Sequence, residues 1–272
     1  MSDTLSSRML VNTLGIPGIL LMIWLGGFWF TMFTTVVMLL AIREFYQINS
    51  TQGSAPLLWL GWIVTLGIGM MYYNPGALAD NYMVVAIIGF FLVGMVIELF
   101  RDKPNPTRNI AITFLGIFYI PILLGTLISL RQMDTVHYSH LTFGLFISIW
   151  MCDSAAYLIG KKWGRKKIFK RISPNKTIVG CVAGLVGAGI VFVIMHSFNL
   201  LGSQFDWNDV VVFSFIAGVV GQIGDFIESM FKRDMNVKDT GQFLMGHGGV
   251  LDRFDSLILA SPFLFIYLKL LH

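Results

Sequence analysis

The chain has 272 residues, of which 56% are hydrophobic and only 12% are charged, and its mean hydropathy is +0.74. A soluble domain carries about 25% charged residues, so this composition excludes a water-soluble globular protein, a disordered chain and a secreted disulfide scaffold. The formal net charge of +4 would suit a nucleic-acid partner, but the charges lie between long apolar stretches. The sequence therefore predicts an integral membrane protein that binds no nucleic acid.

The apolar stretches are long enough to provide nine membrane-spanning helices. Crossing the hydrocarbon core takes about 20 mainly apolar residues. The first stretch, 9–42, is long enough for two spans and is divided at Gly26 and Gly27. The predicted helices cover residues 10–26, 28–45, 56–73, 82–100, 110–130, 141–160, 178–200, 209–229 and 254–271.

We therefore expect an all-α, polytopic membrane protein that forms a single integral membrane domain, 1–272. Five helices fall in residues 1–140, and the four helices of residues 141–272 carry the polar cytoplasmic loops that we expect to be catalytic.

The basic residues predict the orientation of these helices. With the N-terminus in the cytoplasm, nine helices place every lysine and arginine except Arg131 and Lys269 on the cytoplasmic side. Such an excess of basic residues in cytoplasmic loops is the positive-inside rule. We therefore expect a cytoplasmic N-terminus and an external C-terminus.

The loop between the sixth and seventh predicted helices, 161–177, is strongly basic. On its own, such a loop is typical of a solvated segment that sets topology and touches anionic lipid headgroups. Its last residues stand where the seventh helix begins, and hydroxyls, a lysine and free amide groups at a helix N-terminus bind anions. We therefore predict that phosphate groups of a substrate bind to Ser173, Asn175, Lys176 and Thr177.

The segment 224–255 is the densest polar region of the chain. Four of its residues share one helical face by their i, i+3, i+4, i+7 spacing: Asp225, Glu228, Ser229 and Lys232. Asp252 and Asp255 lie three residues apart where the last predicted helix begins. The intervening run Gly246-His247-Gly248-Gly249 allows positive φ angles and amide groups that point at an oxyanion. Carboxylates, lysines and glycines in this pattern predict a magnesium–phosphate site, and internal salt bridges are the structural alternative.

Together these motifs resemble the signature of the phosphatidate cytidylyltransferase family. The matching residues of this segment are Ser229, Lys232, Arg233, Lys238, Asp239, Gly246, His247, Gly248, Gly249, Asp252, Arg253 and Asp255. Asp153, the Ser-Pro-Asn-Lys-Thr stretch and the box Arg43-Glu44-Phe45-Tyr46 also resemble the family. The sequence departs from the pattern at Met245, where the family usually has proline, and at Val179, where it usually has glutamate.

The resemblance implies transfer of CMP from CTP to phosphatidic acid, which yields CDP-diacylglycerol and pyrophosphate for phospholipid synthesis. We expect Asp225 and Asp252 to hold magnesium, and a second cation is left open. The residues expected to be catalytic are Asp153, Lys232, Arg233, Lys238, Asp239, His247, Arg253 and Asp255. The residues expected to bind substrate are Ser173, Asn175, Lys176, Thr177, Ser229, Gly246, Gly248 and Gly249.

Two other classes of function remain open: a neighbouring lipid-phosphate cytidylyltransferase or polyprenol kinase on the same scaffold, and a transporter. A transporter would distribute polar, broken helices over two related halves near the midplane, whereas here polarity is concentrated at the cytoplasmic side of the last four helices. We expect a bacterial cytoplasmic-membrane enzyme whose active site faces the cytoplasm. Its expected partners are CTP, phosphatidic acid and bilayer lipid, and a homodimer is left open.

Overall fold

The computed structural model describes residues 2–74, 82–137, 140–241 and 248–271. These residues form helices joined by short loops, and the only β-type pairing within them is an isolated bridge between Lys167 and Thr177. The expected all-α class is therefore confirmed. The chain divides into two compact units: unit 1 comprises Met1–Ile128 and Met235–Asp252, and unit 2 comprises Ser129–Asp234 and Arg253–His272.

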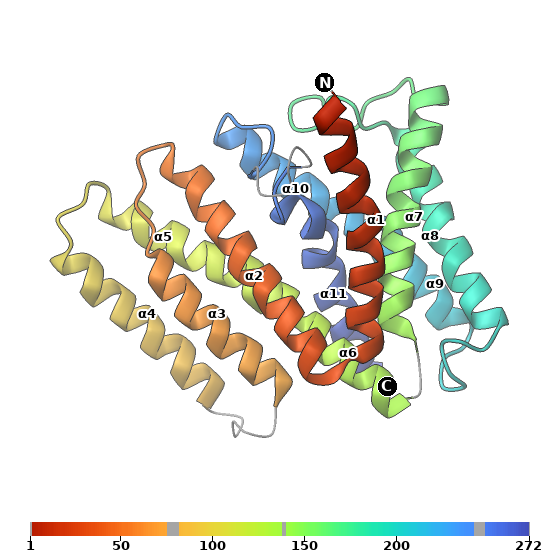
Figure 1. Ribbon diagram of the computed structural model, residues 1–272, viewed down its shortest axis with the longest axis horizontal. Coiled ribbons are helices and arrows are strands. Elements are labelled where there is room, and N and C mark those ends of the chain that lie inside the picture. Colours follow the sequence, from red (N-terminus) through yellow and green to blue (C-terminus); the bar gives the residue numbers. More distant parts are fainter. Residues whose placement is uncertain (1, 75–81, 138–139, 242–247, 272) are drawn as a thin grey trace. The chain divides into compact units, whose positions relative to one another are not determined.

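The helices of unit 1 come from the first half of the chain and pack side by side (Figure 1). They are α1 (Ser2–Leu25), α2 (Gly27–Ser50), α3 (Leu58–Tyr73), α4 (Tyr82–Phe100), α5 (Pro106–Ile117), the π-helical η2 (Phe118–Ile122) and the start of α6 (Thr126–His137). The predicted break between the first two helices is confirmed, because Gly26 and Gly27 have φ angles of 62° and 44°. Only glycine adopts such angles without strain, so the chain turns there.

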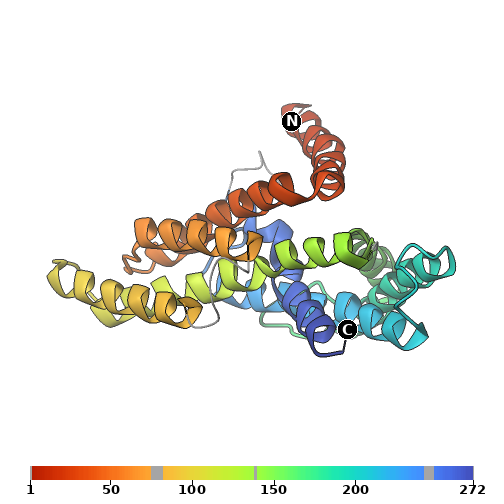
Figure 2. The same ribbon diagram turned by 90° about the horizontal axis from the view of Figure 1, so that it is seen from below.

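The predicted helix 110–130 lies within one helical segment, Pro106–Thr135, whose hydrogen-bonding pattern changes locally. A π-helical turn, η2, follows α5 and contains Pro121, which has no amide hydrogen to donate to the preceding turn. The side view in Figure 2 shows this chain segment running on from α5 into α6. Proline is a recognised cause of local irregularity inside a long helix, so the local change follows from the residue itself.

Tyr46 of α2 fixes two neighbouring helices within unit 1. Its hydroxyl donates to the carbonyl of Thr113 at 2.6 Å, and its ring lies against Gly61 of α3 and Gly116 of α5. A Cβ atom at Gly61 would approach the ring to 2.7 Å, which is too close for a real contact. The absence of side chains at these glycines therefore allows the tyrosine to lie between the helices.

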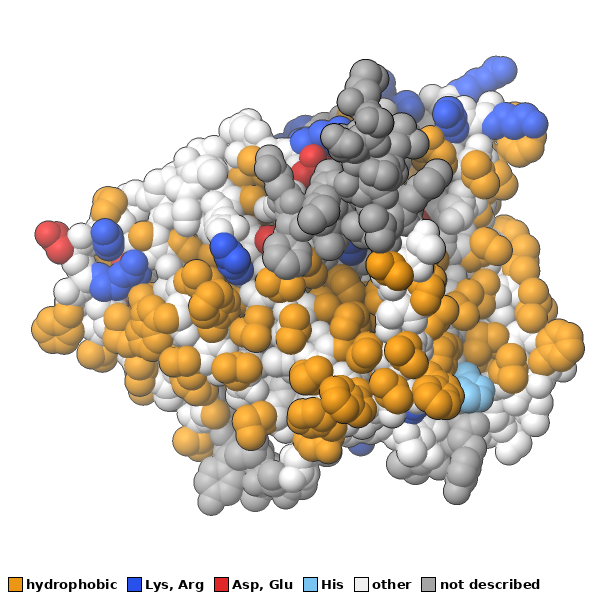
Figure 3. Space-filling model, in the orientation of Figure 1, with side chains coloured by type: hydrophobic (Ala, Val, Ile, Leu, Met, Phe, Trp, Pro, Cys, Tyr) orange, Lys and Arg blue, Asp and Glu red, His pale blue; other side chains and the backbone are white. Residues whose placement is uncertain are grey.

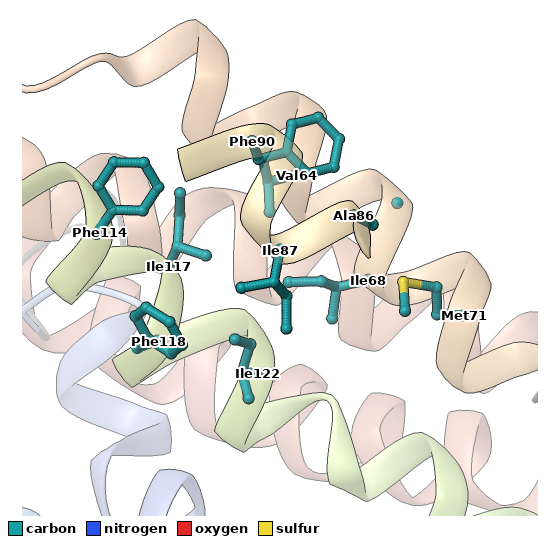
Figure 4. A pocket seen from close by; sticks show the side chains of 11 residues that line it. Val64, Ile68, Met71, Ala86, Ile87, Phe90, Phe114, Ile117, Phe118 and Ile122 are labelled. Atoms are coloured by element: carbon teal, nitrogen blue, oxygen red, sulfur yellow. The ribbon is translucent and has the colours of Figure 1, made fainter. Parts of the chain in front are cut away.

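Unit 1 also contains a small apolar pocket of about 50 Å³ between α3, α4 and α5 with η2 (Figure 4). Hydrocarbon and aromatic side chains point into it, among them Ile68, Ile87, Phe114 and Ile122. No charged side chain lines this pocket. It therefore offers nothing that would bind a phosphate or a metal ion.

Unit 2 contains the remainder of α6 and α11 (Leu251–Leu271) after their first residues, together with α7, α8, α9, η3 and α10. The bounds are α7 Leu141–Trp163, α8 Ile178–Ser197, α9 Trp207–Phe215, the π-helical η3 Ile216–Val220 and α10 Gly221–Asp234. Figure 1 shows α7 and α8 side by side. Their contact depends on glycines at i, i+4 and i+7 of α8, namely Gly180, Gly184 and Gly187. Small residues in such a stripe let membrane helices approach closely.

We expect Gly180→Ala to destabilise unit 2. A Cβ atom at this position would lie 2.8 Å from the carbonyl oxygen of Ala156 in α7, so the two helices must separate. Overpacking of this kind costs about 1–3 kcal/mol. The control is Gly189→Ala on the same helix, where a Cβ atom would meet its nearest neighbour at 3.6 Å.

Both replacements gain similar helix propensity, so the difference between them isolates the packing term. Thermal unfolding in detergent should show a lower melting temperature for Gly180→Ala and an unchanged or higher one for Gly189→Ala. Equal melting temperatures would show that the close contact is not needed.

Six helical segments in the described residues are long and apolar enough to cross a membrane: Gly27–Ser50, Pro106–Thr135, Leu141–Trp163, Ile178–Ser197, Trp207–Asp234 and Leu251–Leu271. Three shorter apolar helices coincide with the other predicted spans: Thr13–Leu25, Leu58–Tyr73 and Val85–Phe100. Hydrophobic side chains cover much of the visible surface of each unit (Figure 3). The chain is thus a polytopic membrane protein, while the count of nine spans, the single domain and the orientation of the termini stay predictions.

Candidate active site

A polar cavity of about 650 Å³ lies in unit 2, between the C-terminal half of α7 and the N-terminal turns of α8 and α10. Its volume falls in the range of typical small-molecule sites, about 300–1,000 Å³. Six residues predicted from the sequence line it: Asp153, Ser173, Asn175, Lys176, Thr177 and Asp225. Three segments that are separate in the sequence therefore meet at one place, as the motifs predicted.

Lys176 and Asp225 form an ion pair in this cavity. The lysine ammonium also lies 4.6 Å from the centre of the Phe226 ring, and the Ser229 hydroxyl donates to Asp225 Oδ1 at 3.4 Å. About a quarter of each side chain is exposed, 30% for Lys176 and 24% for Asp225. The pair is therefore held in place and still accessible to a ligand.

The loop that carries Lys176 folds back on itself before α8. The amide of Ile168 donates to the carbonyl of Lys176 at 3.3 Å, and the amide of Ile178 donates to the carbonyl of Lys166 at 3.0 Å. Thr177 caps α8, because its hydroxyl accepts the amide hydrogen of Gly180 at 3.1 Å. The predicted position of these residues at a helix N-terminus is confirmed, and the Thr177 hydroxyl has a structural role there.

Asp255 brings a third carboxylate to unit 2. Gly224 lets α10 approach α11 closely, since a Cβ atom there would lie 2.6 Å from the carbonyl oxygen of Asp255. The charges of Asp225, Asp153 and Lys176 all act on the Asp255 carboxyl group. The cavity lining itself carries Asp153 and Asp225 beside Lys161, Lys167 and Lys176, so carboxylates that suit a cation and amines that suit phosphates lie together.

The side-chain oxygen atoms of this region suit a magnesium ion that is also bound to the phosphates of a nucleotide. Among the residues that the structure describes, no group of three or more His, Cys, Asp or Glu side chains is placed to hold a metal ion. Magnesium in phosphoryl-transfer sites is usually held by only one or two carboxylates together with substrate phosphates and water. Asp225, beside a lysine and in a cavity of nucleotide size, fits that arrangement.

The next turns of α10 hold Lys232 and Arg233, both predicted to be catalytic. Lys232 forms an ion pair with Glu228, whose side chain is only 1% exposed, and Arg233 Nε donates to the carbonyl of Ile172 at 3.1 Å. The shared face of Asp225, Glu228, Ser229 and Lys232 is confirmed by the helix. A contribution of Lys232 and Arg233 to catalysis stays a prediction, since their observed contacts are with the protein.

We expect Lys232→Met to destabilise the protein, because it removes a cation that pairs with the buried Glu228 carboxylate. Removing one partner of a buried ion pair costs about 3–5 kcal/mol. The double variant Lys232→Met/Glu228→Gln removes both charges and should recover most of the lost stability. Melting temperatures of the wild type, the single variants Lys232→Met and Glu228→Gln, and the double variant measure the coupling between the two side chains. Additive losses of stability would show that the ion pair contributes little.

A second group of predicted residues lies in unit 1 around Asp252. Asp252 Oδ2 accepts hydrogen bonds from the Thr240 amide at 3.0 Å, the Thr240 hydroxyl at 3.0 Å and the Gly249 amide at 2.7 Å. Gly248 has a φ angle of 81°, so the predicted positive φ in the glycine run is confirmed there. The Gly249 amide, expected to face a substrate oxyanion, points at Asp252.

Sequence reasoning missed two residues of this group, Glu44 and Thr240. Glu44 is buried, and it accepts hydrogen bonds from the Val250 and Leu251 amides, both at 2.9 Å. Its Oε2 also lies 3.2 Å from the Thr240 hydroxyl, which can donate its one hydrogen either to Glu44 or to Asp252. The available signal was the box Arg43-Glu44-Phe45-Tyr46, which resembles the family but indicated no partner.

Known proteins that are similar to this chain match it over most of its length. A family model described as the cytidylyltransferase family matches residues 6–271. The chain belongs to the cytidylyltransferase family. The phosphatidate cytidylyltransferase of Brucella suis is 32% identical over 246 residues, which cover 90% of this chain and 86% of the relative. Those of Synechocystis and Staphylococcus haemolyticus are 28% identical over 293 residues (98% and 97%) and 30% identical over 247 residues (90% and 91%).

The remaining predicted residues of this cytidylyltransferase are placed as follows. Lys238, Asp239 and Arg253 are exposed, and Gly246 and His247 lie outside the described residues. Asp225 belongs to unit 2 and Asp252 to unit 1, so their pairing on one magnesium ion stays a prediction.

Proposed function

We propose that this cytidylyltransferase transfers CMP from CTP to phosphatidic acid, giving CDP-diacylglycerol and pyrophosphate. The observation that carries the proposal is the polar cavity of unit 2, where Lys176 and Asp225 face each other in a chain that matches the family along its length. The names of its relatives in Brucella suis and Staphylococcus haemolyticus supply the lipid substrate. The alternative of a transporter has no comparable support.

The reaction needs charge neutralisation more than a strong base. An oxygen of the lipid phosphate attacks the α-phosphorus of CTP, a new P–O bond forms, and the bond to the β-phosphate breaks with release of pyrophosphate. Because the attacking phosphate is already anionic, the main barrier is repulsion between it and the triphosphate. Lys176 offers a cation at the cavity, and Lys238 and Arg253 are exposed cations that we propose contact the phosphates.

We propose that Asp225 and Asp252 hold magnesium, and that Asp153 and Asp255 strengthen the negative field around it. When bound, magnesium neutralises phosphate charge and polarises the α-phosphorus. Ser173, Asn175 and Ser229 would orient the phosphates by hydrogen bonds. We propose that His247 acts as a general acid or as a hydrogen-bonding group beside Gly246. We propose that Asp239 also contributes to catalysis.

We further propose nine spans in a bacterial cytoplasmic membrane, with the cavity facing the cytoplasm. The support is the distribution of basic residues, of which only Arg131 and Lys269 fall on the other side. Single cysteines at Lys170 and at His272, in a background without Cys152 and Cys181, should react with an impermeant maleimide from opposite sides of the membrane. Reaction of both from one side would contradict the nine-span topology.

A panel of lipid phosphates tests the substrate. Purified protein, magnesium and CTP labelled in the cytosine ring are incubated with phosphatidic acid, a polyprenyl phosphate or a lysophosphatidic acid. We expect labelled, chloroform-soluble product with phosphatidic acid. Preference for another lipid phosphate would overturn the proposed substrate, and it would direct attention to Val179 and Met245, the two departures from the family pattern.

A further inference from the structure

Glu44 is a buried carboxylate whose partners lie about two hundred residues further along the chain. Only 5% of the residue is exposed. Oε1 accepts the amide hydrogen of Val250, and Oε2 accepts that of Leu251 and lies within reach of the Thr240 hydroxyl. Within the described parts of the chain no ion pair involves Glu44. Its charge is therefore balanced by backbone amides and a hydroxyl.

The two amides that Glu44 binds lie at the start of α11, which begins at Leu251. The first amides of a helix have no partner within the helix, and a negative charge placed there is stabilised by the helix dipole. Glu44 thus satisfies these amides from another helix, α2. The backbone at Val250 and Leu251, next to Asp252, is held in place within unit 1 as a result.

Thr240 connects the two carboxylates. Its hydroxyl lies 3.2 Å from Glu44 Oε2 and 3.0 Å from Asp252 Oδ2, and it has one hydrogen to donate to either. Its amide donates to Asp252 Oδ2 at 3.0 Å. Displacement of Glu44 would therefore move the groups that orient the Asp252 carboxylate.

The fit around Glu44 leaves no spare room. A Cβ atom at Gly241 would lie 2.7 Å from Glu44 Oε1, and a Cβ atom at Gly249 would collide with Glu44 Oε2 and with the Thr240 hydroxyl. Side chains at either glycine would push the carboxylate away from the amides. The close backbone approach to Glu44 accounts for glycine at both positions.

We propose that Glu44 is a positioning residue that acts on the reaction through Asp252, by fixing the backbone of Val250 and Leu251 and, with Thr240, the orientation of the Asp252 carboxylate. The inference rests on the proposed function for the role of Asp252 in catalysis. The hydrogen bonds of Glu44 to the Val250 and Leu251 amides, which we call the clamp, are a property of the fold. The two parts are tested by different measurements.

Hydrogen–deuterium exchange tests the clamp without any substrate or metal. Glu44→Gln keeps the size of the side chain but places an amide N–H opposite a backbone N–H, so one hydrogen bond to Val250 or Leu251 is lost. The peptide that covers residues 248–254 should exchange faster in this variant than in the wild type. Glu98→Gln is the matched control: Glu98 is equally buried in unit 1 but is bonded to Arg101 and Asn109. Unchanged exchange in Glu44→Gln would overturn the proposal.

Steady-state kinetics test the consequence for catalysis. Changing groups that orient a metal ligand typically lowers activity or metal affinity by about 10–100-fold. We expect Glu44→Gln to lower kcat, or to raise the magnesium concentration for half-maximal rate, by that amount, and Glu98→Gln to change neither. Wild-type kinetics in a Glu44→Gln protein with faster exchange would overturn the positioning role. A wild-type enzyme inactive on phosphatidic acid would instead contradict the proposed function and leave the exchange result to decide the clamp.

If Glu44→Gln does not fold, two variants of Thr240 test the same proposal. Thr240→Val removes the hydroxyl and keeps the shape, and it should reduce kcat and accelerate exchange of the same peptide. Thr240→Ser keeps the hydroxyl and should restore most of both. Equal behaviour of the valine and serine variants would contradict a role for the shared hydrogen bond.

Discussion

Asp225→Asn is expected to abolish CMP transfer while the protein stays folded. The change removes a negative oxygen from the polar cavity but keeps the shape of the side chain. Loss of one preorganised electrostatic contact at a reacting centre costs about 10²–10³-fold in rate, and we expect at least that loss here. Turnover at saturating CTP, phosphatidic acid and magnesium measures it.

Stability should not fall with the activity. The change loses the ion pair with Lys176, which is worth little because both side chains are partly exposed to solvent. It also relieves repulsion, because Asp153 lines the same cavity as Asp225 and the charge of Asp225 acts on Asp255. Asp234→Asn, an exposed position on the same helix, is the control and should retain full activity. If Asp225→Asn kept wild-type turnover, Asp225 would not bind the metal or the phosphates.

Lys176→Met should lower kcat/KM by about 10–100-fold, through the loss of a charge-assisted contact worth roughly 1.5–3 kcal/mol. The methionine keeps an apolar stem of similar length beside Phe226, so packing changes little. We propose that Lys176 contacts a substrate phosphate, and a change confined to KM for one substrate would identify which phosphate it binds.

Lys167→Met provides the matched comparison for Lys176. Lys167 lines the same cavity, but its ammonium donates to the carbonyl of Asn175 at 3.3 Å and forms no ion pair with a carboxylate in the described structure. We expect a smaller kinetic effect there. Equal effects at both positions would mean that the general positive charge of the loop matters, as in a topogenic or lipid-contacting segment, rather than a specific contact of Lys176.

The helices could be predicted because spanning hydrocarbon requires long apolar runs. The break at Gly26 and Gly27 was equally visible, since consecutive glycines favour a turn. The end of α2 was placed too early, at residue 45, whereas the helix continues to Ser50. Charged residues at 43 and 44 indicated the end of a span, but Glu44 is buried by contacts that a hydropathy pattern cannot contain.

The candidate site was predictable where its residues are local in sequence. Ser173 to Thr177 precede a helix and Asp225 begins a polar helical face, so their spacing in the sequence indicated them as candidate site residues. The clamp of Glu44 on Val250 and Leu251 joins residues about two hundred positions apart, and no periodicity in one sequence encodes such a contact. Its formation depends on tertiary packing within unit 1.

The most direct test of the central claim follows the two ends of the triphosphate. Purified wild-type protein is incubated with phosphatidic acid, magnesium and CTP that carries a radiolabel in either its α- or its γ-phosphate. A cytidylyltransferase acting on phosphatidic acid places the α-label in the chloroform-soluble lipid and the γ-label in pyrophosphate. A γ-label in the lipid would show a kinase instead, and an unlabelled lipid from both forms of CTP would contradict the proposed reaction.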